Sequence, residues 1–352
     1  MSPLIATARA LMTKGKGLLA MDESVGTCNR RFAELGIAQT LEARRRYRDL
    51  LVTTPGLSDA ISGAILFDET LQQRVEAGTP MVDVLRLAGI VVGIKVDAGA
   101  HALACHPGEH ITEGLDGLRE RLQRYAAMGV QFAKWRAVLT MGDGLPSSAA
   151  IACNAHALAR YAALCQEAGL VPIVEPEVLM DGAHTLARCS EVTTEVLQRV
   201  FEELHRQGVG LEAMLLKPNM VLPGLTSATT PSLVDVADAT VACLLRTVPA
   251  AVAGVAFLSG GQTAALATAR LNAMHQRSVS KPGDTGLSRP DLPWPLTFSF
   301  GRALQQPAMK IWAGDDANRS AAQRALLHRA RMNGAAACGA YQGEMDVQEE
   351  KP

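Results

Sequence analysis

Short apolar segments recur along the whole chain, and each is followed by a longer stretch in which apolar residues have helical spacing. Segments of four or five residues rich in Val, Ile, Leu and Phe are typical of buried strands. The predicted strands are 17–21, 64–67, 91–94, 132–135, 171–174, 213–216, 255–258 and 296–299. The amphipathic segments between them include 115–128, 148–168, 191–207, 233–246 and 263–274.

This alternation predicts an α/β protein whose parallel sheet is covered by helices. Eight strand–helix units favour a (β/α)8 TIM barrel over an open doubly wound sheet, which would usually have fewer strands and a glycine-rich turn after the first. We expect one barrel domain with an N-terminal helix over residues 1–342 and a polar, mobile tail at 343–352. The turn-rich segment 278–295 predicts a long surface loop before the last strand.

Composition narrows the class of protein. The 352 residues include 34 Lys plus Arg and 35 Asp plus Glu, and this balance argues against nucleic-acid or polybasic membrane partners. No apolar run reaches the roughly 18 residues of a membrane span, and the first residues do not resemble a secretory signal. Seven cysteines without a Cys-x-x-Cys motif agree with a reducing compartment. We therefore expect a cytoplasmic protein.

Polar residues end the predicted strands. In a barrel the carboxyl ends of all strands converge on one mouth, where functional residues gather. The residues at these ends are Asp22, Glu69, Lys95, Lys134, Glu175, Lys217, Ser259 and Arg302. Three pairs are spaced two apart, as are side chains on one side of a strand: Lys95 with Asp97, Lys134 with Arg136, and Glu175 with Glu177. Several opposite charges would then meet in one site.

Three lysines at strand ends, Lys95, Lys134 and Lys217, suggest covalent chemistry. Burying a charged lysine is costly, and clustered cations lower one another's pKa. One amine could then be neutral and nucleophilic near pH 7, and such an amine forms a Schiff base with a ketone or aldehyde. For any single lysine, a structural ion pair or a loop position is an equally good interpretation.

Carboxylates at the same strand ends would complete this chemistry. A Schiff base forms only if a group protonates the departing water, and carbon–carbon cleavage needs a base for a substrate hydroxyl. Asp22, Glu175 and Glu177 are candidates. The alternative is that they balance neighbouring cations, which we expect of at least one of them.

Two loops could bind phosphate. Barrels often hold a phosphate in the loops after strands seven and eight, which here contain residues 258–262 (Leu-Ser-Gly-Gly-Gln) and Gly301 with Arg302. A second basic set that could hold another anion comprises Arg30, Arg31 and Arg44. A solvated helix face is its alternative and the better interpretation for Arg45 and Arg46. The spacing of His101, His106 and His110 matches no metal motif, so we predict no metal site.

These motifs together resemble class I fructose-bisphosphate aldolase, the metal-independent enzyme that works through a Schiff base. The resemblance runs from about Lys14 to about Ala337. The matching motifs, in chain order, are GKGLLA at 15–20, DES at 22–24, GIKVD at 93–97, FAKWR at 132–136, VPIVEPE at 171–177, LLKPNM at 215–220, LSGGQ at 258–262 and GRAL at 301–304.

The resemblance implies a role for each candidate. Lys217 would form the Schiff base, Glu175 would be the acid and base of carbinolamine formation and dehydration, and Asp22 would handle the C4 hydroxyl. Lys134 and Glu177 would set the local charge and support proton transfer. Ser259, Gly260 and Arg302 would hold the C1 phosphate. Ser24, Lys95 and Arg44 would lie near the C6 end, with Arg31 at the mouth. Gly261, Gly301 and Arg136 complete the predicted substrate-binding set.

The resemblance also implies a homotetrameric lyase of glycolysis and gluconeogenesis that cleaves fructose 1,6-bisphosphate without a cofactor. The sequence departs from the family pattern in four places. Ala213 stands where the family has Gly, Val25 where it has Thr, and the loop 278–293 is longer than in animal enzymes. Animal members end in a tyrosine that assists proton exchange, whereas the last tyrosine here is Tyr341. We therefore predict a different proton carrier or a slower carbanion step.

Two alternatives remain open at this stage. One is a Schiff-base aldolase that prefers fructose 1-phosphate or another ketose phosphate. The other is a scaffold or filament-binding protein that retains the aldolase fold. The presence of Asp22, Lys134, Glu175 and Lys217 favours an enzyme over a scaffold, since site residues and not fold decide function.

Overall fold

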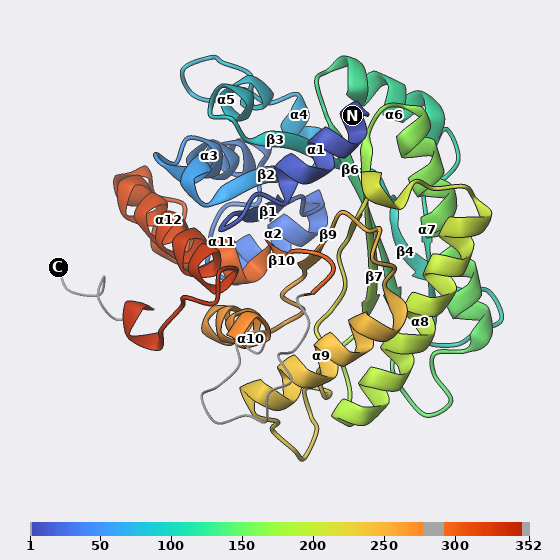
Figure 1. Cartoon of the computed structure of the whole chain (residues 1–352). Helices are drawn as coiled ribbons and strands as arrows, with labels where there is room; N and C mark the ends of the chain where they lie inside the picture. The colour runs from blue at the N-terminus through green and yellow to red at the C-terminus, as the bar shows by residue number, and fades with distance from the viewer. Residues whose placement is uncertain (1, 277–291, 347–352) are drawn as a thin grey trace.

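Eight parallel strands close into a barrel within residues 2–276 and 292–346, the part of the chain that the computed structural model describes (Figure 1). Around the barrel the order is β1, β10, β9, β8, β7, β6, β3, β2. The strands are β1 (Gly17–Met21), β2 (Ile61–Leu66), β3 (Val91–Lys95), β6 (Phe132–Leu139), β7 (Val171–Val178), β8 (Leu215–Leu216), β9 (Gly254–Phe257) and β10 (Leu296–Phe300). The predicted fold class is confirmed. Most of the predicted loop 278–295 lies outside the described residues.

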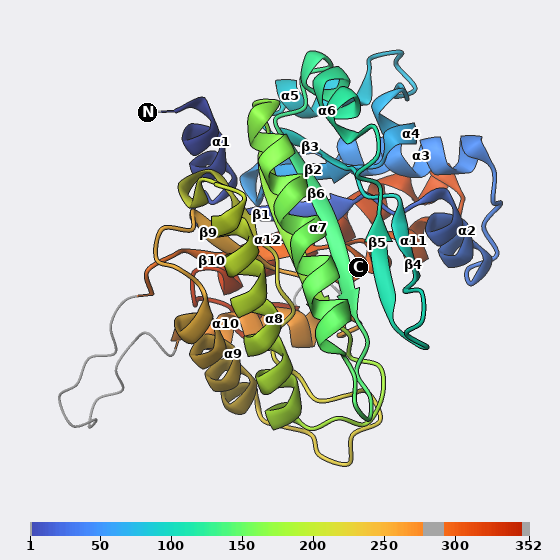
Figure 2. The same cartoon turned by 90° about the vertical axis from the view of Figure 1, so that its right-hand side faces the viewer.

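Helices cover the outside of the barrel (Figure 2). Side-chain oxygens of Ser147, Thr185 and Ser232 accept hydrogen bonds from backbone N–H groups in the first turns of α7, α8 and α9, which satisfies donors that a helix start leaves free. The helices are α1 (Pro3–Leu11), α2 (Val25–Ala33), α3 (Leu41–Val52), α4 (Asp68–Leu71), α5 (Met81–Leu87), α6 (Leu118–Ala127), α7 (Ser148–Glu167), α8 (Leu186–Arg206), α9 (Leu233–Thr247), α10 (Ala264–Gln276), α11 (Arg302–Trp312) and α12 (Arg319–Ala336).

The central strands β6 and β7 are longer than the apolar pattern predicts. Their pairing continues past the first charged residue, with Arg136 opposite Glu175 and Val138 opposite Glu177. The strands continue past these charges, and Arg136 and Glu177 form an ion pair across them at the mouth of the barrel. At β2 the predicted strand end was too late. The strand ends at Leu66, so Glu69 lies on the short helix α4 and not at a strand end.

A small antiparallel hairpin, β4 (Gly99–Ala102) with β5 (His110–Glu113), follows β3 and was missed by the sequence interpretation. Its residues are mostly Gly, Ala and His and are largely exposed, so they carry no apolar alternation. His101 lies on β4 and His110 on β5.

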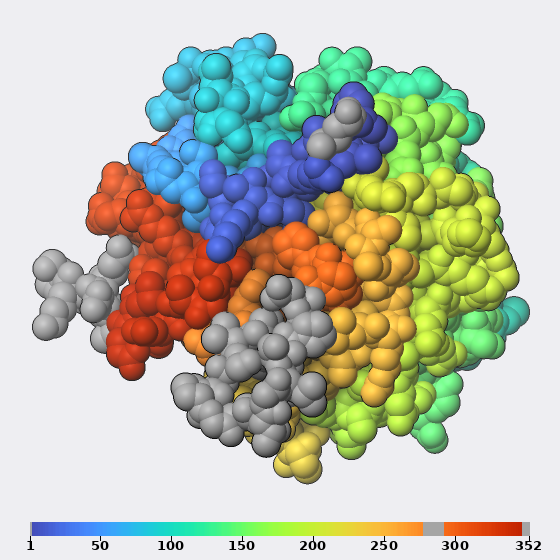
Figure 3. Space-filling view, in the orientation of Figure 1, coloured from blue at the N-terminus to red at the C-terminus, as the bar shows by residue number. Residues whose placement is uncertain are grey.

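The N-terminal end of the barrel is closed by packing. Inside, Leu18, Ile65, Phe132 and Ile173 are fully buried. The helix α1 lies across this end and adds Leu11 and its neighbours to the same cluster (Figure 3). A Cβ atom on Gly93 would come within 2.2 Å of the Phe132 ring, so glycine makes room for that ring. Any functional cavity must therefore open at the opposite end.

The first residues of the predicted tail are folded. Gly343–Asp346 form a short 3-10 helix whose Asp346 accepts a 2.6 Å hydrogen bond from the Tyr341 hydroxyl and pairs with Arg329. Residues 343–346 of the predicted mobile tail are therefore folded, and 347–352 lie outside the described residues. Among the described residues no helix is both long and apolar enough to cross a membrane.

Candidate active site

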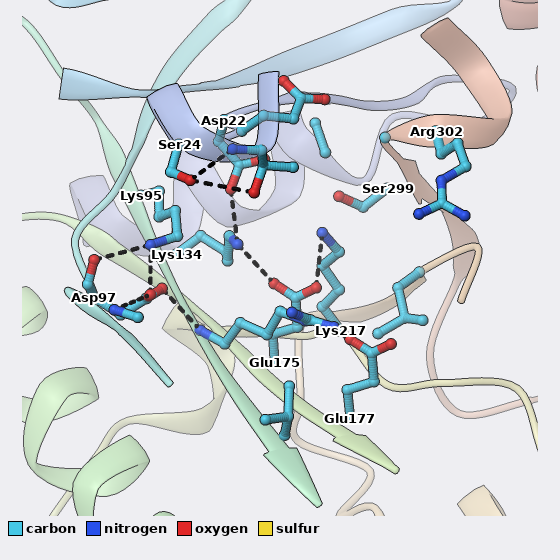
Figure 4. Close-up of a pocket in the computed structure, with 18 of the residues that line it drawn as sticks. Asp22, Ser24, Lys95, Asp97, Lys134, Glu175, Glu177, Lys217, Ser299 and Arg302 are labelled. Carbon is cyan, nitrogen blue, oxygen red and sulfur yellow. Dashed lines mark hydrogen bonds and ion pairs between the residues drawn. The ribbon is translucent and has the colours of Figure 1, made fainter. Parts of the chain in front are cut away.

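A cavity of about 550 Å³ opens at the carboxyl ends of the barrel strands (Figure 4). Nearly all of the predicted site residues line it, although they come from every part of the chain. These residues are Asp22, Ser24, Arg31, Lys95, Lys134, Arg136, Glu175, Glu177, Lys217, Ser259, Gly260, Gly261, Gly301 and Arg302. Arg44 does not line it.

Lys134, on β6, bridges two carboxylates at the base of the cavity. Its Nζ atom lies 2.7 Å from Asp22 Oδ2 and 3.1 Å from Glu175 Oε2, and all three side chains are almost fully buried. Burial alone would disfavour the ammonium, but the two carboxylates outweigh it and hold the pKa of Lys134 above its usual value. The prediction that clustered lysines lower one another's pKa is therefore wrong for Lys134, because carboxylates separate the cations.

Lys217 follows the two-residue strand β8 and points into the same cavity (Figure 4). Its backbone N–H donates to the Val174 carbonyl at 2.8 Å, which fixes the residue beside β7. Its Nζ atom lies 3.1 Å from Glu175 Oε1. Asp22, Lys134, Glu175 and Lys217 thus form one continuous chain of alternating charge.

Both carboxylates of this chain are ionised at neutral pH. Burial raises the pKa of each, but nearby ammonium groups outweigh burial. For Asp22, mainly Lys134 and Lys217 lower the pKa to about 2. For Glu175, Lys134, Lys217 and Arg136 lower the pKa below its usual value. A carboxylate 3.1 Å from an amine can accept its proton, so Glu175 is placed for acid–base chemistry at Lys217.

Two further charged pairs extend along the wall of the cavity. Arg136 Nε lies 2.5 Å from Glu177 Oε2, one step further out on β6 and β7 than Lys134 and Glu175. Lys95 Nζ lies 2.5 Å from Asp97 Oδ1, and Asp97 also accepts from the backbone N–H of Arg136 at 3.2 Å. The residues paired by period two therefore line the same cavity, although Asp97 lies beyond the end of β3.

One end of the cavity carries groups of the kind that bind anions. Gln262 N donates to Ser259 O at 3.1 Å and closes a turn over Gly260 and Gly261, whose φ angles of +49° and +76° favour glycine. Nearby, Arg302 begins α11 and is exposed. Helix starts and tight glycine turns present backbone N–H groups to anions.

Ser299 lines the same cavity as Arg302 and was not predicted as a site residue (Figure 4). Its hydroxyl is buried and has no hydrogen-bond partner among the described residues. A buried hydroxyl without a partner is unfavourable, which makes Ser299 a candidate for contact with a ligand in this cavity.

The opposite wall comes from the start of α2. Ser24 caps this helix, accepting from Thr27 N at 3.3 Å. Glu23, which sequence interpretation did not single out, is buried between Arg31 at 2.6 Å and Arg48 at 2.7 Å. Its position next to Asp22 is the one signal that could have found it. Thr27, Ala98 to Ala100, Leu258 and Val138 also line the cavity, and nothing in their residue types marks them out.

Arg44 was predicted to lie near a substrate phosphate, and the structure places it elsewhere. Its guanidinium makes two hydrogen bonds, of 2.9 and 2.7 Å, to Glu69 on α4, and it also binds Asn29. Arg44 and Glu69, whose predicted positions were both wrong, thus neutralise each other. Arg45 and Arg46 of the same helix pair with Glu42 and Asp316.

No group of three or more His, Cys, Asp or Glu side chains in the described ranges is arranged to hold a metal ion. The absence of a cofactor or metal remains a prediction from the sequence.

Comparison with known proteins agrees with this geometry. The family described as glycolytic fructose-bisphosphate aldolase class-I matches residues 3–352. The chain belongs to this family. A probable fructose-bisphosphate aldolase class 1 of Xanthomonas axonopodis pv. citri is 52% identical over 97% of this chain and 98% of its own length. The cytosolic fructose-bisphosphate aldolase 6 of Arabidopsis thaliana is 50% identical over 98% of this chain and 93% of its own.

A solved structure supports the fold of this aldolase-family chain. Fructose-bisphosphate aldolase from Plasmodium falciparum, in a ternary complex with TRAP and a small-molecule inhibitor, superposes with a TM-score of 0.92. The two sequences are 46% identical, and the match covers 97% of this chain and 95% of that one.

Proposed function

We propose that this protein cleaves fructose 1,6-bisphosphate reversibly into dihydroxyacetone phosphate and glyceraldehyde 3-phosphate through a Schiff base on Lys217. One observation carries the proposal. A buried lysine lies 3.1 Å from an ionised carboxylate, in a polar cavity with an anion-binding turn at one end.

The first step is formation of the imine. Glu175 Oε1 accepts a proton from Lys217, and the neutral amine attacks the C2 carbonyl of the ketose. The resulting carbinolamine loses its hydroxyl as water when the protonated Glu175 returns the proton. Glu175 suits both roles because it touches Lys217 with one oxygen and Lys134 with the other.

The second step breaks the C3–C4 bond. Asp22, ionised and on the far side of Lys134, accepts the proton of the C4 hydroxyl. The C4 oxygen becomes the aldehyde, and the electron pair of the broken bond moves into the iminium to give an enamine. Protonation at C3 and hydrolysis of the imine then release dihydroxyacetone phosphate. Lys134 keeps its proton, so it stabilises the carboxylates and does not act as a base.

The two ends of the cavity hold the two phosphates. The 259–262 turn, the unpartnered hydroxyl of Ser299 and the exposed Arg302 form the C1 end. Lys95, Ser24 and Arg31 lie on the other wall and form the C6 end. Arg136 and Glu177 lie on the wall that β6 and β7 provide.

No tyrosine of the described residues lines the cavity, so we expect another group to deliver the proton that reaches C3. Tyr341 is the last tyrosine of the chain, and its hydroxyl binds Asp346. Burial and this hydrogen bond raise the pKa of Tyr341 to about 12, and the residue does not line the cavity. We therefore expect a different proton carrier or a slower carbanion step. Exchange at the enamine carbon that is as fast as in an enzyme with a terminal tyrosine, and that is unchanged by deletion of 343–352, would contradict this.

Turnover on two sugars tests the proposal. The protein should release dihydroxyacetone phosphate from fructose 1,6-bisphosphate with a kcat/KM well above that for fructose 1-phosphate, because cations line the second phosphate end. The K217M variant should release neither product, whereas K16M, which changes a lysine bound to the Ser58 carbonyl outside the cavity, should keep full activity. Equal kcat/KM values on both sugars would mean that the second phosphate is not recognised and that a ketose monophosphate is an equally good substrate. No cleavage by the folded wild type would refute the proposal.

We further propose a homotetramer that works in the cytoplasm in glycolysis and gluconeogenesis. Two relatives from Arabidopsis thaliana carry the word cytosolic in their names, and the resemblance to the family implies four subunits. Analytical ultracentrifugation should give a mass about four times the 37.3 kDa of the chain.

A further inference from the structure

Arg270, on α10, is a buried cation that has no carboxylate partner among the residues that the structure describes. Arg270 is 8% exposed, and its Nε atom has no hydrogen-bond partner among the described residues. The other arginines buried to this degree each pair with an acid: Arg44 with Glu69, Arg48 with Glu23 and Arg329 with Asp346. Burying a charge is costly unless the charge is paired. The unpaired guanidinium of Arg270 therefore suggests a function that offsets this cost.

The one polar contact that the structure gives Arg270 leads to the proposed phosphate end. Its Nη1 atom donates a 2.8 Å hydrogen bond to Oε1 of Gln262, the residue that closes the 259–262 turn. Gln262 is itself buried, and its Nε2 lies 3.6 Å from the sulfur of Met220. Because a guanidinium only donates, this contact fixes which end of the amide faces α10.

The same turn is connected to the segment that carries Lys217. Leu258 N donates to the Pro218 carbonyl at 3.1 Å, and Met220 lies three residues after Lys217. Gln262 is thus held between α10 and the segment after β8. A shift of its side chain would move the turn relative to the lysine.

We propose that Arg270 is a positioning residue for the phosphate-binding turn. Through Gln262 it holds the 259–262 turn in shape, and its uncompensated positive charge raises the affinity of that turn for a phosphate group. The proposal rests on the proposed function of the turn as the C1-phosphate end. It concerns a residue that does not itself line the cavity.

The test compares Arg270 with a matched buried arginine. R270M removes the charge and the hydrogen bond, and R270K keeps the charge. R329M is the control, because Arg329 is also 8% exposed but pairs with Asp346 and Thr268 instead of the turn. The measurements are the dissociation constant of inorganic phosphate by phosphorus NMR titration, kcat and KM for fructose 1,6-bisphosphate, and Tm.

We expect R270M to weaken phosphate binding and to raise KM about tenfold, the change that about 1.4 kcal/mol produces, with kcat within about threefold of wild type. R270K should recover most of the affinity. R329M should lower Tm and leave the phosphate dissociation constant within about twofold. A folded R270M that binds phosphate as tightly as wild type would overturn the proposal, as would an equal loss of affinity in R329M.

A double-mutant cycle tests the connection through Gln262. If Arg270 acts through this side chain, R270M combined with Q262L should weaken phosphate binding no more than the worse of the two single variants. Fully additive losses would refute the connection. Because phosphate binding is measured without turnover, an inactive wild type would refute the proposed function and leave the role of Arg270 open to the same titration.

Discussion

Replacing Lys134 by methionine tests the central electrostatic feature of the site. The substitution keeps the length and apolar stem of the side chain but removes the ammonium that lies 2.7 Å from Asp22 and 3.1 Å from Glu175. Two buried carboxylates then lose their shared partner. Breaking a buried ion pair from one side costs about 3–5 kcal/mol, so K134M should lower the free energy of unfolding by about that amount at pH 7.

The pKa of Asp22 gives a check on this magnitude. The folded state lowers it from 3.8 to about 2, nearly two units, which corresponds to about 2 kcal/mol. Because the pKa is depressed, this stabilisation is present above pH 3.8 and is lost as the pH falls towards 2. Asp22 therefore supplies a substantial part of the cost expected for K134M, and Glu175, whose pKa is also lowered, supplies more.

In K134M, burial without the ammonium should instead raise both carboxyl pKa values, so both groups should take up protons by about pH 4. The unfolding free energy that K134M lacks relative to wild type should then be about 1–2 kcal/mol smaller at pH 4 than at pH 7. Urea unfolding at fixed protein concentration, followed by the fluorescence of the buried Trp135, measures the difference in unfolding free energy between K134M and wild type. K16M is the control, and its cost should be about 1 kcal/mol or less at both pH values. A deficit below about 1 kcal/mol at pH 7, or one independent of pH, would refute this reasoning.

Three further substitutions separate chemistry, binding and packing. D22N should reduce cleavage about 10²- to 10⁴-fold but leave imine formation with dihydroxyacetone phosphate intact, and cleavage within tenfold of wild type would exclude Asp22 as the base. R302A should raise KM for fructose 1,6-bisphosphate about 10- to 100-fold without changing Tm, because the side chain is exposed and free to bind an anion; a change below threefold would remove it from the phosphate site. F132A, inside the barrel, should cost about 3–5 kcal/mol in urea unfolding, whereas a cost below about 1 kcal/mol would contradict the packing of the closed end.

The barrel was predictable because its strands are buried on both faces. Such strands form continuous apolar runs, as at Leu215–Leu216, and a charged residue that follows a run marks the mouth. Lys134, Glu175 and Lys217 were found in this way. Spacing by two residues then placed Arg136 and Glu177 on the same wall.

What the pattern could not give was the pairing of charges. Arg44 and Glu69 have the residue types of a substrate site, yet they neutralise each other outside the cavity. The sequence does not reveal this contact, because it joins α3 to α4 across 25 residues. The same limit explains why the lysines were expected to lower one another's pKa. Asp22 and Glu175 lie against Lys134 and raise its pKa, and their contacts with it cannot be read from the sequence.

Features with weak apolar patterns were also missed. The exposed hairpin β4–β5 has few large apolar residues, and its alternation is lost among Gly, Ala and His. Arg270 lies in a helix that the pattern did predict, but nothing in the spacing shows that its charge is buried or that it binds Gln262. Tertiary packing decides both properties.

Borohydride reduction with dihydroxyacetone phosphate, followed by peptide mass mapping, tests the central claim most directly. The reduced adduct should lie on Lys217 alone and should be unchanged by a metal chelator. The matched variant K134M, if it folds, should still be modified at residue 217, because Lys134 does not form the bond. An adduct on Lys134 or on another lysine, or none in a folded protein that binds the ligand, would contradict the Schiff-base mechanism proposed for Lys217.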